Sequence, residues 1–318
     1  MRIKAPIRDT ENVSMAAVLH KLVELATVHP NDRVAHQIER MGQAEPANSD
    51  LGRPKRLGLP PLSELGHDLL GATPLARTIV VGRPFLLIAA YAVLFQLGFW
   101  YLAVLIVPYV YVTVGAAVHD LVHRSLDFPD WLNALLLSVV GGLELESGHT
   151  LRETHQVHHR KVHTSVDPEG YVDQYSSLRT LGEGPLYKHY LACWVLKNRP
   201  KSRAWVGAEA LWAQGTIIAA IVFGWQAPAF GVYIAMIVFG SWLFPYVGVK
   251  LVHSDPGQNL LSGTRTMRGR VVSILGCGLT FHLEHHLYPR VPGHKLRFLA
   301  QRLDEPFSEL GVEPTRAL

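Results

Sequence analysis

Two long stretches of the chain are apolar and almost free of charge. Residues 84–123 contain no Lys or Arg and a single acid, Asp120, and residues 204–249 contain no Lys or Arg and a single acid, Glu209. A bilayer core is crossed by ~20 helical residues, so each stretch can hold two spans joined by a tight turn. We predict spans over residues 80–98, 100–119, 207–224 and 229–249.

Shorter patterns surround these spans. Residues 131–142 are apolar but too short to cross a bilayer, which favours a buried or interfacial helix. Residues 14–28 repeat apolar positions at helical spacing and predict an amphipathic helix, whereas residues 37–64 are rich in Pro, Gly and charge, as in a linker. The pattern therefore predicts an all-α integral membrane protein with four transmembrane helices in two hairpins and a helical cap.

The distribution of basic residues predicts the orientation of these spans. Of the thirty Lys and Arg residues, all but Arg83 lie before, between or after the two predicted hairpins, and none lies at the turns inside them. Because positive residues remain on the cytoplasmic side, we expect both termini and the cap to be cytoplasmic. We divide the chain into an N-terminal region (residues 1–78), a membrane domain (79–305) and a C-terminal tail (306–318).

The overall composition agrees with a membrane protein and excludes several other classes. Apolar residues make up 48% of the chain and charged residues 18%, with a net charge of +4. No dense Lys/Arg run is present, which argues against a nucleic-acid partner. The two cysteines, Cys193 and Cys277, are far apart, and this excludes a disulfide framework, a zinc ribbon and a built-in iron–sulfur domain.

Three histidine clusters carry the candidate chemistry. They are His119 and His123, then His155, His158 and His159, then His282, His285 and His286. Residues at i, i+3 and i+4 share one helix face, so each cluster can aim its imidazoles at one point. Imidazole is the commonest metal ligand among side chains, and eight of them exceed the needs of one four-ligand ion. The spacing therefore predicts a site for two metal ions, although lone histidine pairs elsewhere are usually structural.

The order of these motifs resembles the membrane fatty acid desaturase superfamily, which includes lipid hydroxylases and carotenoid hydroxylases and ketolases. His-x-x-x-His is followed by two His-x-x-His-His boxes around two hairpins, and the resemblance spans about residues 80–305. His119-Asp120 is similar to the start of the family's first box, and residues 281–292 are similar to its third. Arg124 departs from the pattern, since many desaturases have Gly at this position.

The resemblance implies two iron ions that activate O2 as a co-substrate. It also implies a ninth ligand near the end of the last span, where His253 stands. Asp120, His149 and Glu284 are candidates to orient the ligands from behind, because a ligating imidazole usually donates its other N–H to such a group. Asp167 and Glu169 are further candidates, but we interpret Asp-Pro-Glu as a helix-capping turn.

The implied activity is a fatty acid desaturase acting on an acyl-lipid or acyl-CoA. A carotenoid or other lipid hydroxylase or ketolase is the alternative, because histidine spacing does not separate desaturation from hydroxylation. A metal transporter is the remote alternative. A transporter would place its ligands near the bilayer midplane, whereas these histidines lie at or beyond the ends of the predicted spans. The chain has no flavin, nicotinamide, iron–sulfur or cytochrome b5 motif, so we expect an external electron donor such as ferredoxin, rubredoxin or cytochrome b5.

An acyl substrate beside the irons needs an apolar path. We expect it between the second and fourth spans, with bulky residues ending the path and Gly115 leaving room. The alternative is that these residues simply pack helix against helix. The expected lining residues are Tyr111, Val114, Gly115, Val118, Phe239, Trp242, Leu243 and Tyr246.

Overall fold

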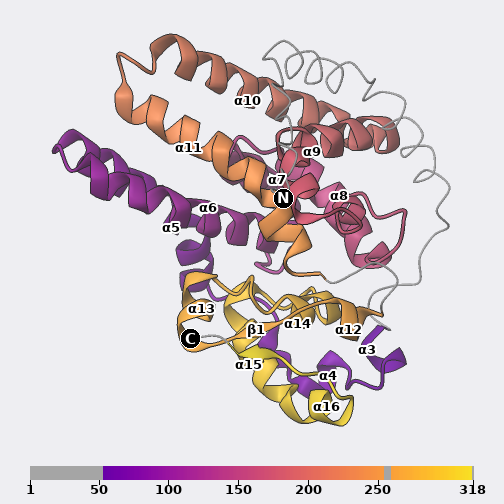
Figure 1. Ribbon diagram of the computed structural model, residues 1–318. Helices are drawn as coiled ribbons and strands as arrows, with labels where there is room; N and C mark the ends of the chain where they lie inside the picture. Colours follow the sequence, from indigo (N-terminus) through magenta and orange to yellow (C-terminus); the bar gives the residue numbers. More distant parts are fainter. Residues whose placement is uncertain (1–52, 254–258, 317–318) are drawn as a thin grey trace, which may run out of the picture. The chain divides into compact units, whose positions relative to one another are not determined.

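The computed structural model describes residues 53–253 and 259–316, which are mainly helical (Figure 1). The predicted helix over residues 14–28 and the first part of the predicted linker lie outside the described residues. The α-helices are α3 (Arg53–Arg56), α4 (Leu62–Leu65), α5 (Pro74–Gln96), α6 (Trp100–Val122), α7 (Asp130–Gly142), α8 (Gly148–Lys161), α9 (Ser177–Asn198), α10 (Arg203–Phe223), α11 (Pro228–Phe244), α12 (Leu260–Gly263), α13 (Arg270–Leu275), α14 (His282–Leu287), α15 (Leu296–Arg302) and α16 (Asp304–Glu309).

Short irregular elements join these helices. The 3-10 turns are η2 (His67–Leu69), η3 (Gly170–Val172), η4 (Pro200–Ser202) and η6 (Gly293–Lys295), and η5 (Pro245–Lys250) is a π-helical segment that continues α11. Two short parallel strands, β1 (Met267–Arg268) and β2 (Thr315–Arg316), pair Met267 with Thr315.

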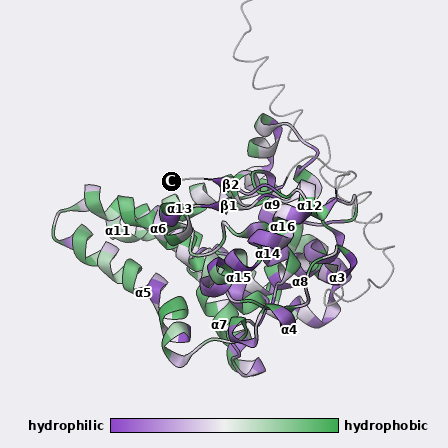
Figure 2. Ribbon diagram, turned by 90° about the horizontal axis from the view of Figure 1, so that it is seen from below, coloured by the Kyte–Doolittle hydropathy of each residue, from purple (hydrophilic) through white to green (hydrophobic). Residues whose placement is uncertain are grey.

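Four helical segments are long and apolar enough to cross a membrane. They cover His67–Gln96, Trp100–Val122, Pro200–Phe223 and Pro228–Lys250. Figure 2 shows α5 and α11 as mainly hydrophobic, whereas α14, α15 and α16 carry many hydrophilic positions. The four predicted spans are confirmed as helices, and residues 131–142 form the short helix α7. The arrangement in two hairpins, the cytoplasmic cap and the division into domains stay predictions.

The first span begins earlier than its hydropathy predicted. The predicted start at residue 80 leaves Arg77 outside the span. The helix instead begins at Pro74, where the Thr73 hydroxyl accepts a hydrogen bond from the Ala76 amide at 3.2 Å. A hydroxyl cap followed by proline in the first turn is a strong start signal, and it fixes the helix end independently of the charges.

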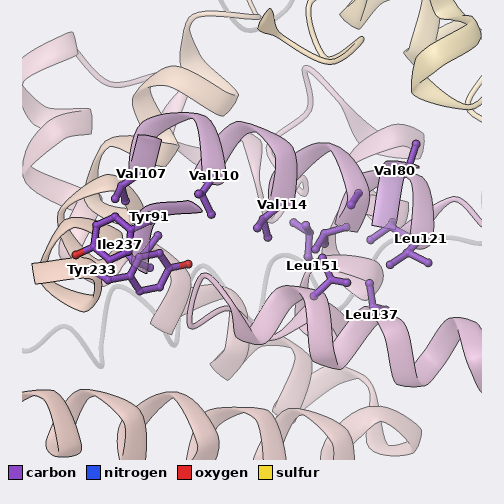
Figure 3. Packing of buried hydrophobic residues seen from close by; sticks show 14 of the residues in the cluster. Val80, Tyr91, Val107, Val110, Val114, Leu121, Leu137, Leu151, Tyr233 and Ile237 are labelled. Atoms are coloured by element: carbon purple, nitrogen blue, oxygen red, sulfur yellow. The ribbon is translucent and has the colours of Figure 1, made fainter. Parts of the chain in front are cut away.

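The membrane helices pack through a cluster of buried residues centred on α6. Figure 3 shows Val107, Val110 and Val114 along α6, with Tyr91 and Tyr233 near the Val107 end. The Tyr91 hydroxyl donates to the Ala229 carbonyl at 2.6 Å, which satisfies a polar group among apolar helices. Helix α6 is therefore held on several sides, and its last turn carries the first histidine pair.

A second cluster ties the start of the described chain to its end. Leu59, Leu65 and Leu69 pack with buried residues of α14, α15 and α16. The Arg302 guanidinium donates to both carboxylate oxygens of Asp68, at 2.8 and 2.7 Å. The prediction of a linker through residue 64 was therefore wrong from residue 53 onward. Its few leucines find an apolar partner surface that is more than 200 residues away in the sequence.

Candidate metal centre

The nine predicted ligand histidines converge from four parts of the chain. His119 lies in the last turn of α6 and His123 caps it; the second box lies on α8, the third on α14, and His253 follows η5. They form two groups, and within each group the candidate ligand atoms lie within 4.8 Å of one another. The first group is His119, His123, His155, His159 and His285, and the second is His158, His253, His282 and His286.

The helix spacing explains how one box serves both groups. On α8, His155 and His159 are one turn apart and belong to the first group, whereas His158 is rotated toward the second. On α14, His285 belongs to the first group and His286 to the second. The rings of His159 and His286 stack at 4.3 Å between centroids, so the two groups are in contact.

Imidazole nitrogens face one another at the centre of each group. In the first group, His159 Nε2 lies 3.1 Å from His155 Nε2 and 2.9 Å from His285 Nε2. In the second group, the Nε2 atoms of His253, His282 and His286 are 3.1–3.4 Å apart. A neutral imidazole has one donor and one acceptor nitrogen. This many converging nitrogens therefore cannot all find hydrogen-bond partners among themselves. Shared cations satisfy them, and the residues therefore fit two metal ions.

Burial keeps most of these imidazoles neutral. Burial, reinforced by neighbouring histidines, lowers the pKa of His159, His285 and His286 well below the usual value. The same holds for the pKa of His253 and His282. A neutral imidazole is the form that binds a metal, so the site is prepared to do so at neutral pH.

Two carboxylates orient the second box from behind. Glu169 lies 2.8 Å from His155 Nδ1 and also accepts from the Thr154 hydroxyl at 2.7 Å. Asp167 lies 2.6 Å from His158 Nδ1. A proton held on Nδ1 leaves Nε2 free to bind a metal, and both histidines belong to a metal group. Hydrogen bonding to Nδ1 also explains the close approach of Glu169 to His155 without a role for Glu169 as a ligand.

These carboxylates replace the supports that the sequence suggested. Asp120 instead accepts from the Gly293 amide at 2.8 Å, and His149 Nδ1 bonds to Glu209 at 2.7 Å. Glu284 pairs with Arg268 at 2.7 Å. The described structure thus gives none of the three a hydrogen bond to a ligand histidine. The sequence of residues 167–169, Asp-Pro-Glu, suits a capping turn. The feature that could have indicated their role is the presence of two carboxylates a short loop after a histidine box.

His253 is held by a backbone carbonyl and lies near a further carboxyl group. His253 Nδ1 lies 3.0 Å from the Val249 carbonyl oxygen and 4.0 Å from Asp173 Oδ2. Burial raises the pKa of Asp173 to about 7. Sequence reasoning missed Asp173 because nothing in its neighbourhood marks it as close to residue 253.

The expected substrate lining is only partly supported. Val114 and Val118 are buried in the helix-packing cluster, and Phe239 and Leu243 point outward with 60% and 37% exposure. Gly115 differs, because a Cβ built on it would meet nothing within 4 Å apart from its own helix. The path between α6 and α11 therefore stays a prediction, which the room beside Gly115 supports and the outward position of Phe239 and Leu243 does not.

The fold and the site together define a helical membrane protein with histidine clusters able to hold metal. The model of the fatty acid desaturase family matches residues 96–315, and the chain belongs to this family. The match covers all nine histidines, and membership implies an oxidoreductase. No curated protein sequence matches the chain.

Proposed function

We propose that this protein is a membrane-bound, O2-dependent di-iron desaturase that introduces a double bond into the acyl chain of a lipid. The observation that supports this most is the convergence of nine buried or half-buried histidines in two touching groups beside apolar helices. Family membership supports iron as the metal and oxidation as the class of reaction.

The chain would contribute position and environment to this reaction. Two bound irons would supply the chemistry, activation of O2 for removal of hydrogen from an unactivated C–H bond. Asp167 and Glu169 hold protons on the Nδ1 atoms of His158 and His155, so their Nε2 atoms stay available. Burial of the imidazoles excludes water, which protects a reactive site from side reactions.

Lipid hydroxylation or ketone formation is the second candidate, because the same ligand set serves both outcomes. We expect mass spectrometry of lipids and pigments from an expressing host to show products that differ by two hydrogens. A His158→Ala strain is the control. Products that gain oxygen instead would establish the hydroxylase or ketolase, and metal uptake without any new lipid would favour the transporter.

An external electron donor has a candidate docking place. A cavity of about 430 Å3 reaches His123 and is lined by Arg124, Arg160 and Arg290. Basic residues around an opening to the centre suit an acidic ferredoxin, rubredoxin or cytochrome b5. We expect the reduction rate by such a donor to fall with increasing salt, and to fall further in Arg160→Gln. A rate that is independent of salt and of Arg160 would place docking elsewhere.

The cytoplasmic orientation is part of the same proposal. Single cysteines introduced at Ser165 and Gln226, after replacement of Cys193 and Cys277, should be labelled from opposite sides of the membrane. Ser165 should react from the cytoplasm. Reaction of both sites from one side would contradict the predicted topology.

A further inference from the structure

A separate cavity of about 240 Å3 lies among α9, α10, α11 and the connection between α7 and α8. None of the nine histidines lines it. Its polar wall includes Glu144, Glu146 and Lys188, and its apolar wall includes Ile217, Val238 and Trp242. A site with one polar and one apolar wall fits an amphipathic ligand such as a lipid.

The polar wall contains a carboxyl group with one unsatisfied oxygen. Lys188 Nζ lies 3.0 Å from a Glu146 oxygen, and this pair is largely buried. Glu144 is 3% exposed, and its Oε1 has no hydrogen-bond partner among the described residues. Two further ionisable residues of the lining are already engaged: Glu209 is bonded to His149 at 2.7 Å, and His189 Nε2 lies 3.6 Å from Cys193 Sγ. Glu144 is therefore the group left for a ligand.

The charges on this wall select the ligand chemistry. A buried polar atom without a partner costs roughly 1–3 kcal/mol, and a ligand that pairs with it recovers this energy. A hydroxyl both donates and accepts, so it satisfies Glu144 whether that residue is ionised or protonated. A carboxylate ligand would add a third acid beside Glu144 and Glu146, and Lys188 already pairs with Glu146.

Helix α6 links the surroundings of Glu144 to the metal centre, because the Gly115 backbone lies near Glu144 and His119 is four residues further along the helix. Tyr111, Gly115 and His119 are four residues apart and share one helix face. The missing side chain of Gly115 leaves the space between its two neighbours open. The Gly115 backbone also lies close enough to Glu144 to moderate the rise in the pKa of Glu144, which is due mainly to burial. Eight residues of helix correspond to ~12 Å, the length of several methylene groups.

We propose that this cavity binds the hydroxyl of a neutral lipid substrate through Glu144, and that the hydrocarbon runs past Gly115 toward His119. The inference rests on the proposed function and makes its substrate a hydroxyl-bearing lipid rather than a free fatty acid. Glu144 acts as a specificity-determining residue, and Gly115 keeps the path to the metal centre open.

Trp242 provides a reporter for binding because it lines the cavity. The purified full chain is titrated with a long-chain alcohol brominated on its hydrocarbon, and separately with the matching brominated carboxylic acid. Bromine quenches tryptophan fluorescence on contact, and Trp242→Phe identifies the signal of this residue. We expect the alcohol to quench Trp242 and the acid to bind at least ~10-fold more weakly.

Two variants at one position separate hydrogen bonding from charge. Glu144→Leu removes the hydrogen bond and should weaken alcohol binding ~10-fold. Glu144→Gln keeps a donor and an acceptor but removes the charge, so it should hold the alcohol and accept the acid more readily. Glu183→Leu is the matched control, because Glu183 is on α9 outside the cavity and should leave both affinities unchanged. Gly115→Leu should keep alcohol binding and iron content while reducing conversion of the alcohol.

Several results would overturn the proposal: equal affinity for alcohol and acid in the unmodified protein, unchanged alcohol binding in Glu144→Leu, or unchanged conversion in Gly115→Leu. Unchanged conversion of the alcohol in Glu144→Leu would show that the cavity holds a bystander lipid. Iron is measured on the same samples. Unmodified protein that binds the alcohol as expected but holds no iron would contradict the proposed function, and not the recognition of hydroxyl by Glu144.

Discussion

Replacing Asp167 by Asn tests how the second box is held. Asp167 is 1% exposed, and its two oxygens face two fixed N–H donors. Oδ2 lies 2.6 Å from His158 Nδ1, and Oδ1 accepts from the Glu169 amide at 2.9 Å. An amide side chain has only one acceptor oxygen, so Asn cannot accept from both donors. One of the two bonds must be lost in either orientation of the Asn.

Both orientations of the Asn weaken the metal group. If its NH2 faces His158, it donates to Nδ1 and moves the imidazole proton to Nε2, the nitrogen that is otherwise free to bind a metal. If its NH2 faces the Glu169 amide, two buried donors oppose each other and the loop shifts. Loss of a hydrogen bond to a charged group costs ~1.5–3 kcal/mol. At about 1.4 kcal/mol per tenfold change, we expect iron affinity to fall ~10- to 100-fold.

The assay is a competition for iron between the purified protein and a chelator of known affinity. Asp304→Asn is the matched control, because Asp304 pairs with Arg268 and touches no ligand histidine. Folding is checked by elution as a single species in detergent. Iron affinity of Asp167→Asn within threefold of the unmodified protein would refute the argument that this carboxylate fixes the tautomer of His158.

Three further predictions concern stability. Although burial opposes its charged form, the neighbouring carboxylate raises the pKa of His158 to about 9. Iron-free protein should therefore hold a stabilising contribution, on the order of 3 kcal/mol, below pH ~6.5 and lose it as pH rises through about 9. Iron loading should abolish this loss in thermal unfolding, and its persistence there would contradict ligation by His158. Arg124 adopts a left-handed φ of 53° and pairs with Asp130 at the surface. Arg124→Gly should be ~1 kcal/mol more stable than Arg124→Ala, since only glycine removes the strain, and equal stabilities would argue against it. Lys188→Met should destabilise by ~3 kcal/mol because it leaves Glu146 buried and unpaired, and adding Glu146→Gln should recover most of the loss; a double variant as unstable as the single one would rule out this cause.

The spans and the ligand histidines were within reach of the sequence because each is a local pattern. Absence of charge over a known length predicts a membrane helix, and His-x-x-His-His predicts one helix face. The structure brings His253 to the second group as the family resemblance implied. Arg124 stands where the family resemblance led us to expect Gly, and its left-handed φ of 53° is a backbone conformation that favours glycine.

The supports of the site depend on contacts that no local pattern contains. Asp167 and Glu169 were visible, but their sequence suits a capping turn equally well, and only the return of the loop onto α8 decides between the two. Val114 and Gly115 are neighbours on α6, yet one is in the core and the other faces open space. Which face of a helix is covered depends on the other helices, and the sequence does not state where they lie.

Both metal groups include histidines of α14, and this imposes an order on biogenesis. His285 completes the first group and His286 the second, so neither group is whole until nearly nine tenths of the chain has been synthesised. The four apolar helices must therefore enter the membrane without help from a metal. Once ions bind, they join α6, α8 and α14 much as a disulfide joins distant segments. Release of iron should then loosen the C-terminal region first and expose it to proteases, while the inserted helices stay in place.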